Sequence, residues 1–520
     1  MLIFETILAL LFGATLLSAF AKRVRIPYPT LLAIGGAAVA FVPGAPQLAL
    51  PAELILALFV APVLLDAAHD TSLRDLRINI RPVLSLVLVA VGLTTAAVAL
   101  AARILFPEMP WPAAIALGAL LAPPDAVAAL AVLREVEPPH RIRKVIEGES
   151  LLNDASALLL YKFAVGAVAV GSFSLHEALP AFPLVVTGSV ALGWVLARLV
   201  GLMVRGIDDA PIAVILQFVI TFGVWLIAEH LGLSAVITIV TFGLTAARRA
   251  PMPLSARLRV SSFAIWESVT FVLNVLAFTL IGLQLRPVLE TLSRAELARY
   301  LTGSLAILAV VVAVRLIWVM INSLLEWRRA KLDPEEALNA KEGLVIGWSG
   351  MRGIVTLAAA MALPAGFPHR DFIQLTALVV VLGTLVVQGL TLRPLLAMLN
   401  LPKDDIVETE IGVARGAALK AALHELDSEG STAAERLRIE FGEGLSRTRA
   451  GGDPHDTERN ALRQRVVPVA RLAIHDLRRA GVIGDDAYRI VEEELDWLEL
   501  SSRSQHEAAQ QEHEQGPPVT

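Results

Sequence analysis

The chain has 520 residues, of which 56% are hydrophobic and only 18% are charged, with a mean hydropathy of +0.65. An average soluble protein has about 25% charged residues, so a wholly soluble protein is not expected. The lack of cysteine excludes a disulfide-built secreted scaffold, and a net charge of −5 without an arginine-rich arm disfavours a nucleic-acid partner. The composition therefore indicates a polytopic membrane protein.

Apolar segments long enough to cross a bilayer recur through residues 1–400. A spanning helix needs about 20 mostly apolar residues, and we expect about thirteen such helices here. The first segment carries Glu5 and no charged leader, so it is interpreted as a span and not as a cleaved signal peptide. In chain order the segments are 2–20, 28–43, 51–67, 82–106, 111–133, 143–170, 179–204, 210–230, 232–247, 262–285, 300–325, 340–363 and 371–398.

The loops between these segments differ in charge. One alternating set of loops holds 19 Lys and Arg residues, and the other set holds 5. Short loops rich in Lys and Arg stay in the cytoplasm. We therefore expect the N-terminus outside and the C-terminus inside, which agrees with an odd number of spans.

The fifth segment contains a break in the middle of an apolar run. Pro123 and Pro124 remove backbone hydrogen bonds and clash with the preceding turn. Freed carbonyl groups at membrane depth are tolerated only where they line a cavity or meet a partner. Asp125 follows at once, and a broken helix with a carboxylate at this depth is typical of transporter ion sites.

The sixth segment has the densest set of polar residues. Ser150 and Asp154 are four residues apart and share a helix face, and Glu149 and Asn153 share the adjacent face. Their hydroxyl, amide and carboxylate oxygens are hard ligands that suit a small cation such as Na⁺. Asp154 lies more than one turn inside the segment without a basic neighbour, which makes it the strongest candidate.

The twelfth segment carries a buried arginine among glycines. Gly347, Gly350 and Gly353 weaken the helix around Arg352, and an arginine at this depth requires a carboxylate partner, for which we expect Glu149. A broken helix in each half of the chain points to the substrate site of an inverted-repeat transporter.

Three further charged residues of the apolar segments bear on the site. Asp66 ends the third segment and either reaches the site from the side or lies at the membrane interface. Lys162 either balances charge within the bundle or reaches the extracellular interface. Arg315 has no evident partner in the sequence.

A change of composition near residue 400 divides the chain. Residues 401–520 contain 15 basic and 24 acidic residues, whereas residues 1–400 have a small positive net charge. We expect a transmembrane domain in 1–400, a cytoplasmic helical module in 401–505 and a disordered end in 506–520. The sequence identifies no partner for this module.

Several motifs together resemble the NhaP/NHE-type sodium/proton antiporters over roughly residues 1–400. The resemblance implies an all-α membrane protein with an NhaA-like inverted-repeat fold, in which a core domain with two crossed unwound helices lies beside a dimerisation domain. It also implies a homodimer in the lipid bilayer of the inner membrane, with no cofactor. The motifs are LLDA (64–67), APPDAVA (122–128), GESLLNDA (148–155), LNVLAFTLIGLQL (273–285) and GWSGMRG (347–353).

The resemblance implies roles for the exchange residues. Asp154 matches the acid that carries both cation and proton, Asn153 matches its neighbour, and Asp125 matches the acid of the first unwound helix. Many members have Thr before this last acid, and here the residue is Pro124. This departure removes a hydroxyl ligand, although Ala122 or Pro123 can still offer a carbonyl.

The resemblance also implies two Na⁺ ligands and one ion pair. Ser150 matches a hydroxyl ligand, and Asp66 matches an acidic ligand of some members. Glu149 and Arg352 match a buried structural ion pair.

These residues predict an antiporter that exchanges Na⁺ or Li⁺ for H⁺ and serves pH homeostasis. Asp154 is ionised when it holds Na⁺ and protonated when it does not, so the two ions compete for one site. Because Asn153 is neutral, we expect one Na⁺ per H⁺ and no net movement of charge.

Two alternatives stay open. The same fold can move K⁺ as its main cation, because cavity size decides selectivity among oxygen-ligated ions. A channel or a membrane sensor is the other class, although no filter loop or nucleotide motif is visible. An enzyme is not expected, because the segments contain no metal cluster or nucleophile motif.

Overall fold

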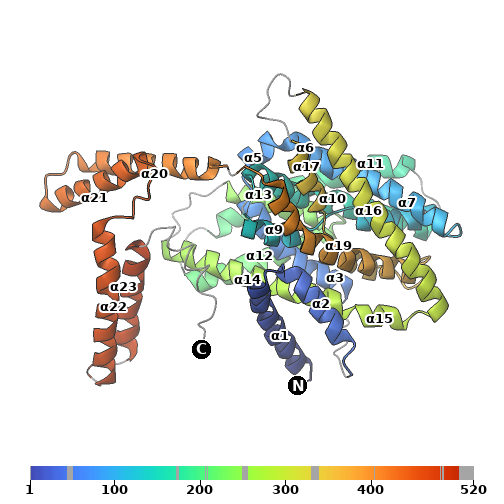
Figure 1. Ribbon diagram of the computed structural model, residues 1–520, viewed down its shortest axis with the longest axis horizontal. Coiled ribbons are helices and arrows are strands. Elements are labelled where there is room, and N and C mark those ends of the chain that lie inside the picture. Colours follow the sequence, from blue (N-terminus) through green and yellow to red (C-terminus); the bar gives the residue numbers. More distant parts are fainter. Residues whose placement is uncertain are drawn as a thin grey trace. The chain divides into compact units, whose positions relative to one another are not determined.

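The computed structural model describes residues 2–43, 51–136, 138–170, 175–204, 207, 209–248, 256–329, 339–402, 404–480, 482 and 485–502. The chain divides into two compact units, Met1–Lys403 and Asp404–Thr520. All regular elements among the described residues are helices, which confirms the predicted all-α class (Figure 1). The segment 506–520, which we expect to be disordered, lies outside the described residues.

The first part of the membrane unit contains two helices that change type along their length. In the third and fourth predicted spans, a π-helical turn interrupts the α-helix. Such turns leave backbone groups outside the regular hydrogen-bond pattern and often occur at functional sites. The elements are α1 (Leu2–Val24), α2 (Tyr28–Ala40), α3 (Ala52–Ile55), η1 (Leu56–Val60), α4 (Ala61–Asp70), α5 (Leu73–Ile78), α6 (Ile80–Leu84), η2 (Ser85–Ala90) and α7 (Val91–Leu105).

The fifth and twelfth predicted spans are each divided into two half-helices, and long helices lie between them in the chain. The predicted interruptions are present at residues 122–125 and 349–353. The elements are α8 (Trp111–Leu121), α9 (Ala126–Val136), α10 (His140–Val170), α11 (Leu175–Met203), α12 (Ala210–His230), α13 (Ala235–Ala247), α14 (Ala256–Leu283), α15 (Leu285–Glu290), α16 (Arg294–Arg329), α17 (Ala340–Trp348), α18 (Ile354–Met361) and α19 (Arg370–Leu399).

Polar side chains define where several of these helices begin. Asp209 accepts the backbone N–H of Ile212 at 3.1 Å at the start of α12. Asn339 and Glu342 form a reciprocal capping box at the start of α17, which satisfies two backbone N–H groups that have no partner within the helix. Local sequence therefore determines where α17, the first half of the second interrupted helix, begins.

Nine described helical stretches are long and apolar enough to cross a membrane, and α2 and α13 are shorter apolar helices. The third and twelfth predicted spans are not among them. The number of thirteen spans stays a prediction, while the multi-pass character of the chain is evident.

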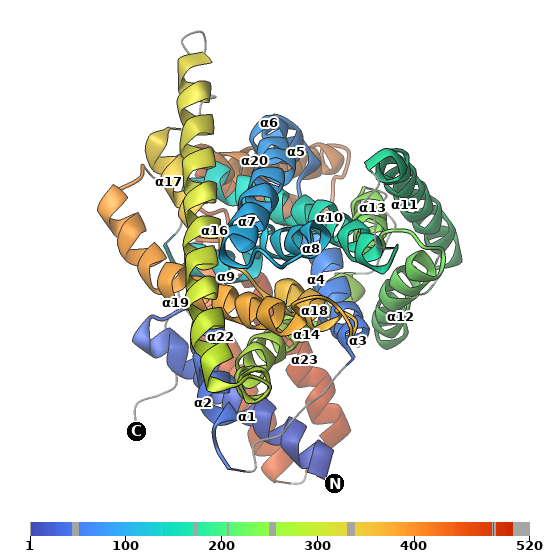
Figure 2. The same cartoon turned by 90° about the vertical axis from the view of Figure 1, so that its right-hand side faces the viewer.

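The helices around the two interruptions pack together, and α18 contacts α8. The long helix α16 contacts α7, α17 and α19, and α10 contacts α8 (Figure 2). Elsewhere in the unit, α14 packs against α1 and α2, and α11 packs against α13. The core around the interruptions is formed by small and aliphatic side chains from α8, α9, α10 and α19.

The described part of the second unit contains four helices in two pairs. They are α20 (Ile406–Leu426), α21 (Thr432–Arg449), α22 (Glu458–Arg479) and α23 (Asp485–Ser502). Helix α20 packs against α21, and α22 packs against α23 (Figure 1). Ion pairs from Arg471 to Asp496 and Glu499, at 2.5 and 2.8 Å, join the second pair.

Candidate functional site

The two interrupted helices meet at their unwound segments. The backbone N–H of Asp125, in the first interruption, donates to the carbonyl oxygen of Met351, in the second, at 2.6 Å. Pro123 and Pro124 have no N–H to continue α8, so the helix ends before them. A direct backbone hydrogen bond thus joins two segments that are far apart in the sequence.

Arg352 closes the end of the first half-helix. Its Nε donates to the carbonyl of Leu121 at 3.0 Å, and its Nη2 donates to that of Ala122 at 3.3 Å. Its Nη1 donates to the carbonyl of Gly350, and its backbone N–H donates to Oγ1 of Thr384 at 3.0 Å. The fully buried guanidinium therefore lies at the negative C-terminal end of α8, where a cation is favoured.

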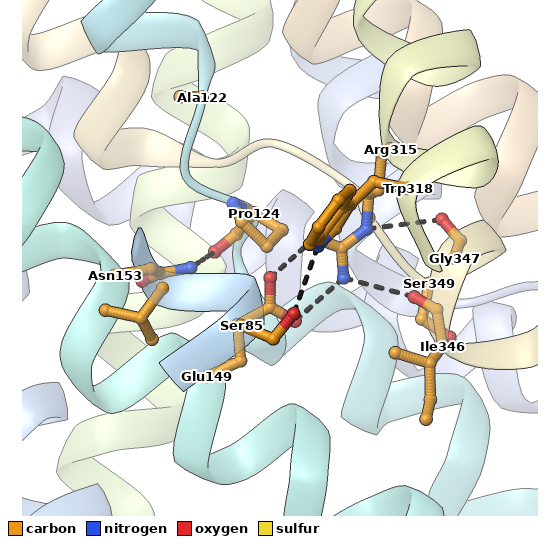
Figure 3. A network of polar contacts seen from close by, with 12 residues as sticks. Ser85, Ala122, Pro124, Glu149, Asn153, Arg315, Trp318, Ile346, Gly347 and Ser349 are labelled. Atoms are coloured by element: carbon orange, nitrogen blue, oxygen red, sulfur yellow. Dashed lines mark hydrogen bonds and ion pairs between the residues drawn. The ribbon is translucent and has the colours of Figure 1, made fainter. Parts of the chain in front are cut away.

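Arg315, on α16, closes the C-terminal end of α17, the half-helix that precedes the second interruption. Its Nη2 donates to the carbonyl of Ile346 at 3.1 Å, and its Nε donates to that of Gly347 at 3.3 Å (Figure 3). These carbonyls lie in the last turn of α17. Each interruption thus has its own buried arginine at the C-terminal end of the preceding half-helix.

The prediction that Glu149 forms an ion pair with Arg352 is wrong. Glu149 pairs with Arg315 through two contacts, Oε1 to Nη1 at 2.5 Å and Oε2 to Nη2 at 2.8 Å (Figure 3). Both side chains are at most 3% exposed. The donors of Arg352 instead bind carbonyl groups that the interruptions leave free, a role that depth in a span does not reveal.

Asp125 lies between the N-terminal ends of the other two half-helices. It directly precedes α9, and its Oδ1 accepts the backbone N–H of Val127 at 2.9 Å. Its Oδ2 lies against Gly353, the residue that precedes α18, where an added Cβ would be only 1.6 Å away. Helix N-termini favour negative charge, so both half-helices stabilise this carboxylate.

Asn153 and Asp154 lie on α10 beside the first interruption. Asn153 is fully buried, and its Nδ2 donates to the carbonyl of Pro124 at 3.1 Å (Figure 3). Its Oδ1 is buried and has no hydrogen-bond partner among the described residues. Asp154 is 8% exposed and lies close enough to Asp125 for their charges to interact. The structure therefore brings together the three residues that we expect to carry the exchange.

Hydrogen bonds tie the π-helical turn η2 to both α10 and α16 at this depth. Ser156, two residues after Asp154, donates to the carbonyl of Val87 at 3.1 Å, and Trp318 donates to Oγ of Ser85 at 3.2 Å (Figure 3). Sequence reasoning missed this contact, because nothing in the apolar run 85–90 marks a π-helical turn.

The remaining candidates lie around this centre. Ser150 on α10 and Asp66 on α4 are half-buried, and the two helices touch each other. Their assignment as Na⁺ ligands stays a prediction. Lys162 pairs with Glu229 of α12 at 3.1 Å, and both side chains are exposed. Of the two roles considered for Lys162, this position favours the surface.

The oxygen ligands that this centre offers suit a monovalent cation. The unsatisfied Oδ1 of Asn153 and the carboxylates of Asp154 and Asp125 are hard ligands. The carbonyl of Ala122, one of the two considered as a ligand, is already engaged by Arg352. Among the described residues, no cluster of three or more His, Cys, Asp or Glu side chains that could hold a metal ion is present.

The sequence also matches known proteins over most of its length. Residues 7–398 match the family model described as "Sodium/hydrogen exchanger, transmembrane". The chain is 32% identical over 444 residues to a sodium, potassium, lithium and rubidium/H⁺ antiporter of Bacillus pumilus, an alignment that covers 81% of this chain and 65% of that protein. It is 31% identical over 433 residues to the Na⁺/H⁺ antiporter ApNhaP of Aphanothece halophytica, covering 82% and 80%.

A solved structure has the same fold. The sodium proton antiporter MjNhaP1 from Methanocaldococcus jannaschii aligns with a TM-score of 0.59 over 77% of this chain and 99% of that protein, at 17% identity. At this identity the likeness concerns the fold alone.

Proposed function

The chain belongs to the sodium/hydrogen exchanger family, and we propose that it exchanges one Na⁺ for one H⁺ at Asp154 without net movement of charge. Members of this family are cation/proton antiporters and not enzymes, and the chain is accordingly a multi-pass membrane transporter. The single-ion stoichiometry, the choice of Na⁺ and the residue that carries the ions are the parts that we propose.

One observation carries the site assignment. The buried Oδ1 of Asn153 has no hydrogen-bond partner among the described residues, and it belongs to the residue beside Asp154. Buried polar atoms are nearly always satisfied, so an unpaired oxygen next to a carboxylate is best explained as a ligand of a cation. Asn153 is itself held in place by Pro124, which fixes this ligand at the first interruption.

The balance of buried charge supports the stoichiometry. Glu149 and Arg315 cancel each other as an ion pair. Arg352 supplies one further positive charge, against two carboxylates, the half-buried Asp125 and the buried Asp154. With all five groups ionised, the centre carries one net negative charge. One Na⁺ or one H⁺ neutralises it, and a buried charge without compensation is costly.

Exchange then follows from competition and movement. A proton on Asp154 removes the charge that attracts Na⁺, and bound Na⁺ removes the driving force for protonation, so the centre holds one ion at a time. Alternating access, by movement of a core domain against a dimerisation domain, exposes the loaded centre first to one side and then to the other. We place this chain in the inner membrane as a homodimer, with the N-terminus outside and the C-terminus in the cytoplasm.

A second candidate function is exchange of K⁺ for H⁺. The relative from Bacillus pumilus is named as an antiporter of sodium, potassium, lithium and rubidium, and oxygen ligands alone do not separate these ions. The cation that is transported fastest therefore has to be measured.

The test is proton movement in proteoliposomes, followed with a pH-sensitive dye under gradients of Na⁺, Li⁺, K⁺ and Rb⁺ at several pH values. We expect dye signals with Na⁺ and no steady current on solid-supported membranes. A steady current would contradict one-to-one exchange. Cation flux without proton movement would favour a channel, and a larger signal with K⁺ would favour the second candidate.

A further inference from the structure

Helix α22 of the second unit exposes most of its apolar side chains. Only Val467 among them is buried, on the side that faces α23. On the opposite side, Val469 is 64% exposed and Leu472 is 65% exposed. Leu462 and Val466 extend this apolar surface at 50% and 61% exposure. Residues at three- and four-residue spacing share a helix face, so these side chains form one stripe.

Opposite charges flank Val469 and Leu472 on the same face of the helix. Arg465 lies four residues before Val469, and Asp476 lies four residues after Leu472. The order Arg465, Val469, Leu472, Asp476 has the four-three-four spacing of a helix-pairing seam. Both charged side chains are exposed, and neither forms an ion pair with another described residue.

This seam is complementary to itself when it is reversed. In an antiparallel pair of α22 helices, the register that sets Arg465 opposite Asp476 of the second helix also sets Val469 opposite Leu472. The two ion pairs and the two apolar contacts are then equivalent by a two-fold axis, which is how a surface patch binds its own copy. A parallel pair would instead place Arg465 beside Arg465 and Asp476 beside Asp476.

We propose that α22 is a dimer contact, in which the seam from Arg465 to Asp476 packs antiparallel against the same seam of a second copy of this chain. An anionic membrane surface fits the seam less well, because Asp476 lies within it and the segment 401–520 has nine more acidic than basic residues. This contact goes beyond ion exchange and is independent of the site at Asp154.

The lack of cysteine in the chain allows a direct test in native membranes. In the full-length protein, Val469→Cys and Leu472→Cys should each form disulfide-linked dimers on mild oxidation, because these positions lie about 4.5 Å apart along the antiparallel pair. Leu462→Cys should not, because its copies lie about 25 Å apart in the same register. Lys420→Cys, at an exposed position on α20, is the control for chance collisions.

Equal cross-linking of Leu462→Cys and Val469→Cys would indicate a parallel pair and overturn the proposal. So would a Val469→Cys yield no higher than that of Lys420→Cys. Protection of Val469→Cys from a water-soluble maleimide by anionic vesicles, without cross-linking, would identify a membrane contact and would also overturn it.

Exchanging the two charges of the seam tests whether a lower cross-linking yield reflects lost pairing or lost folding. Arg465→Glu sets two acids opposite each other and should lower the cross-linking of Val469→Cys about two- to fivefold. Adding Asp476→Arg restores opposite charges in the same register and should restore the yield. If the double variant stays as low as the single one, the two residues do not face each other across a dimer.

Discussion

Glu149 of α10 and Arg315 of α16 form a two-contact ion pair that is sealed from solvent. The same guanidinium holds the last carbonyls of α17, so one residue joins three helices. The pair therefore fixes the helix that carries Asp154 to the second interrupted helix. Its role is positioning, since neither residue lies among the proposed ion ligands.

Glu149→Gln should destabilise the protein strongly. Removing one partner of a buried ion pair leaves the other charge uncompensated and typically costs about 3–5 kcal/mol. Thermal unfolding of the purified protein in detergent measures the effect as a lower melting temperature. The exposed pair of Lys162 and Glu229 provides the control, because Glu229→Gln should cost about 0–1 kcal/mol. Equal melting temperatures for the two variants would contradict the assigned role.

Asp154→Asn should abolish Na⁺-driven proton movement and leave the fold intact. The amide has nearly the same shape as the carboxylate but can neither bind a proton reversibly nor supply a negative charge to Na⁺. Dye signals in proteoliposomes should fall to the level of protein-free vesicles, while gel-filtration behaviour stays that of the parent protein. Exchange at the parental rate would remove Asp154 from the mechanism.

Gly353→Ala should impair transport through Asp125. The new Cβ would lie 1.6 Å from Oδ2 of Asp125, so the carboxylate has to leave its position between the two helix ends. We expect a large loss of exchange rate in the same dye assay. Gly166→Ala is the control, because this glycine lies on α10 and a Cβ there meets no atom within 4 Å. If both variants transport equally well, the position of Asp125 is not critical.

We expect Asp75, which lies outside the membrane-spanning segments, to make a pH-dependent contribution to the stability of the fold. Burial alone would raise the pKa of this carboxyl, but hydrogen bonds from Ser72, His140 and Arg74 outweigh it and hold the pKa below its usual value of 3.8. A lowered pKa means that the ionised group stabilises the fold above pH 3.8, and that this contribution is lost as the pH falls through the lowered value. His140 is the first residue of α10, so the contact also fixes that helix.

Asp75→Asn should therefore lower the melting temperature at pH 7, and the difference from the parent should shrink as the pH approaches 3. Asp70→Asn, at an exposed position at the end of α4, is the matched control and should have little effect at either pH. A difference for Asp75→Asn that is constant over this range would contradict the lowered pKa.

The sequence predicts most of the helical framework and both interruptions, because each has a local cause. Proline at 123 and 124 ends one helix, and glycine at 350 and 353 weakens the other. The helical boundaries of α12 agree with the predicted segment 210–230, since Asp209 caps its first turn. Features that depend on residues next to each other in the chain are thus readable from it.

Contacts across the bundle are not readable in this way. Depth in a span identifies Glu149 and Arg352 as buried charges, but the choice of partner depends on how α16 is turned toward α10. The lone Arg315 in an apolar helix was the available signal, because a buried arginine requires a partner. The position of Asp125 against Gly353 likewise needs the crossing of two helices to be known.

The bond between Arg352 and Leu121 joins residues 231 positions apart in the chain, which bears on the order of folding. During synthesis, α8 enters the membrane long before Arg352 has been made. Until then the carbonyls at the end of α8 lack their donor, and unsatisfied backbone groups are costly in lipid. We therefore expect the first half of the bundle to remain loosely assembled after insertion, and to become compact only when α17 and α18 arrive.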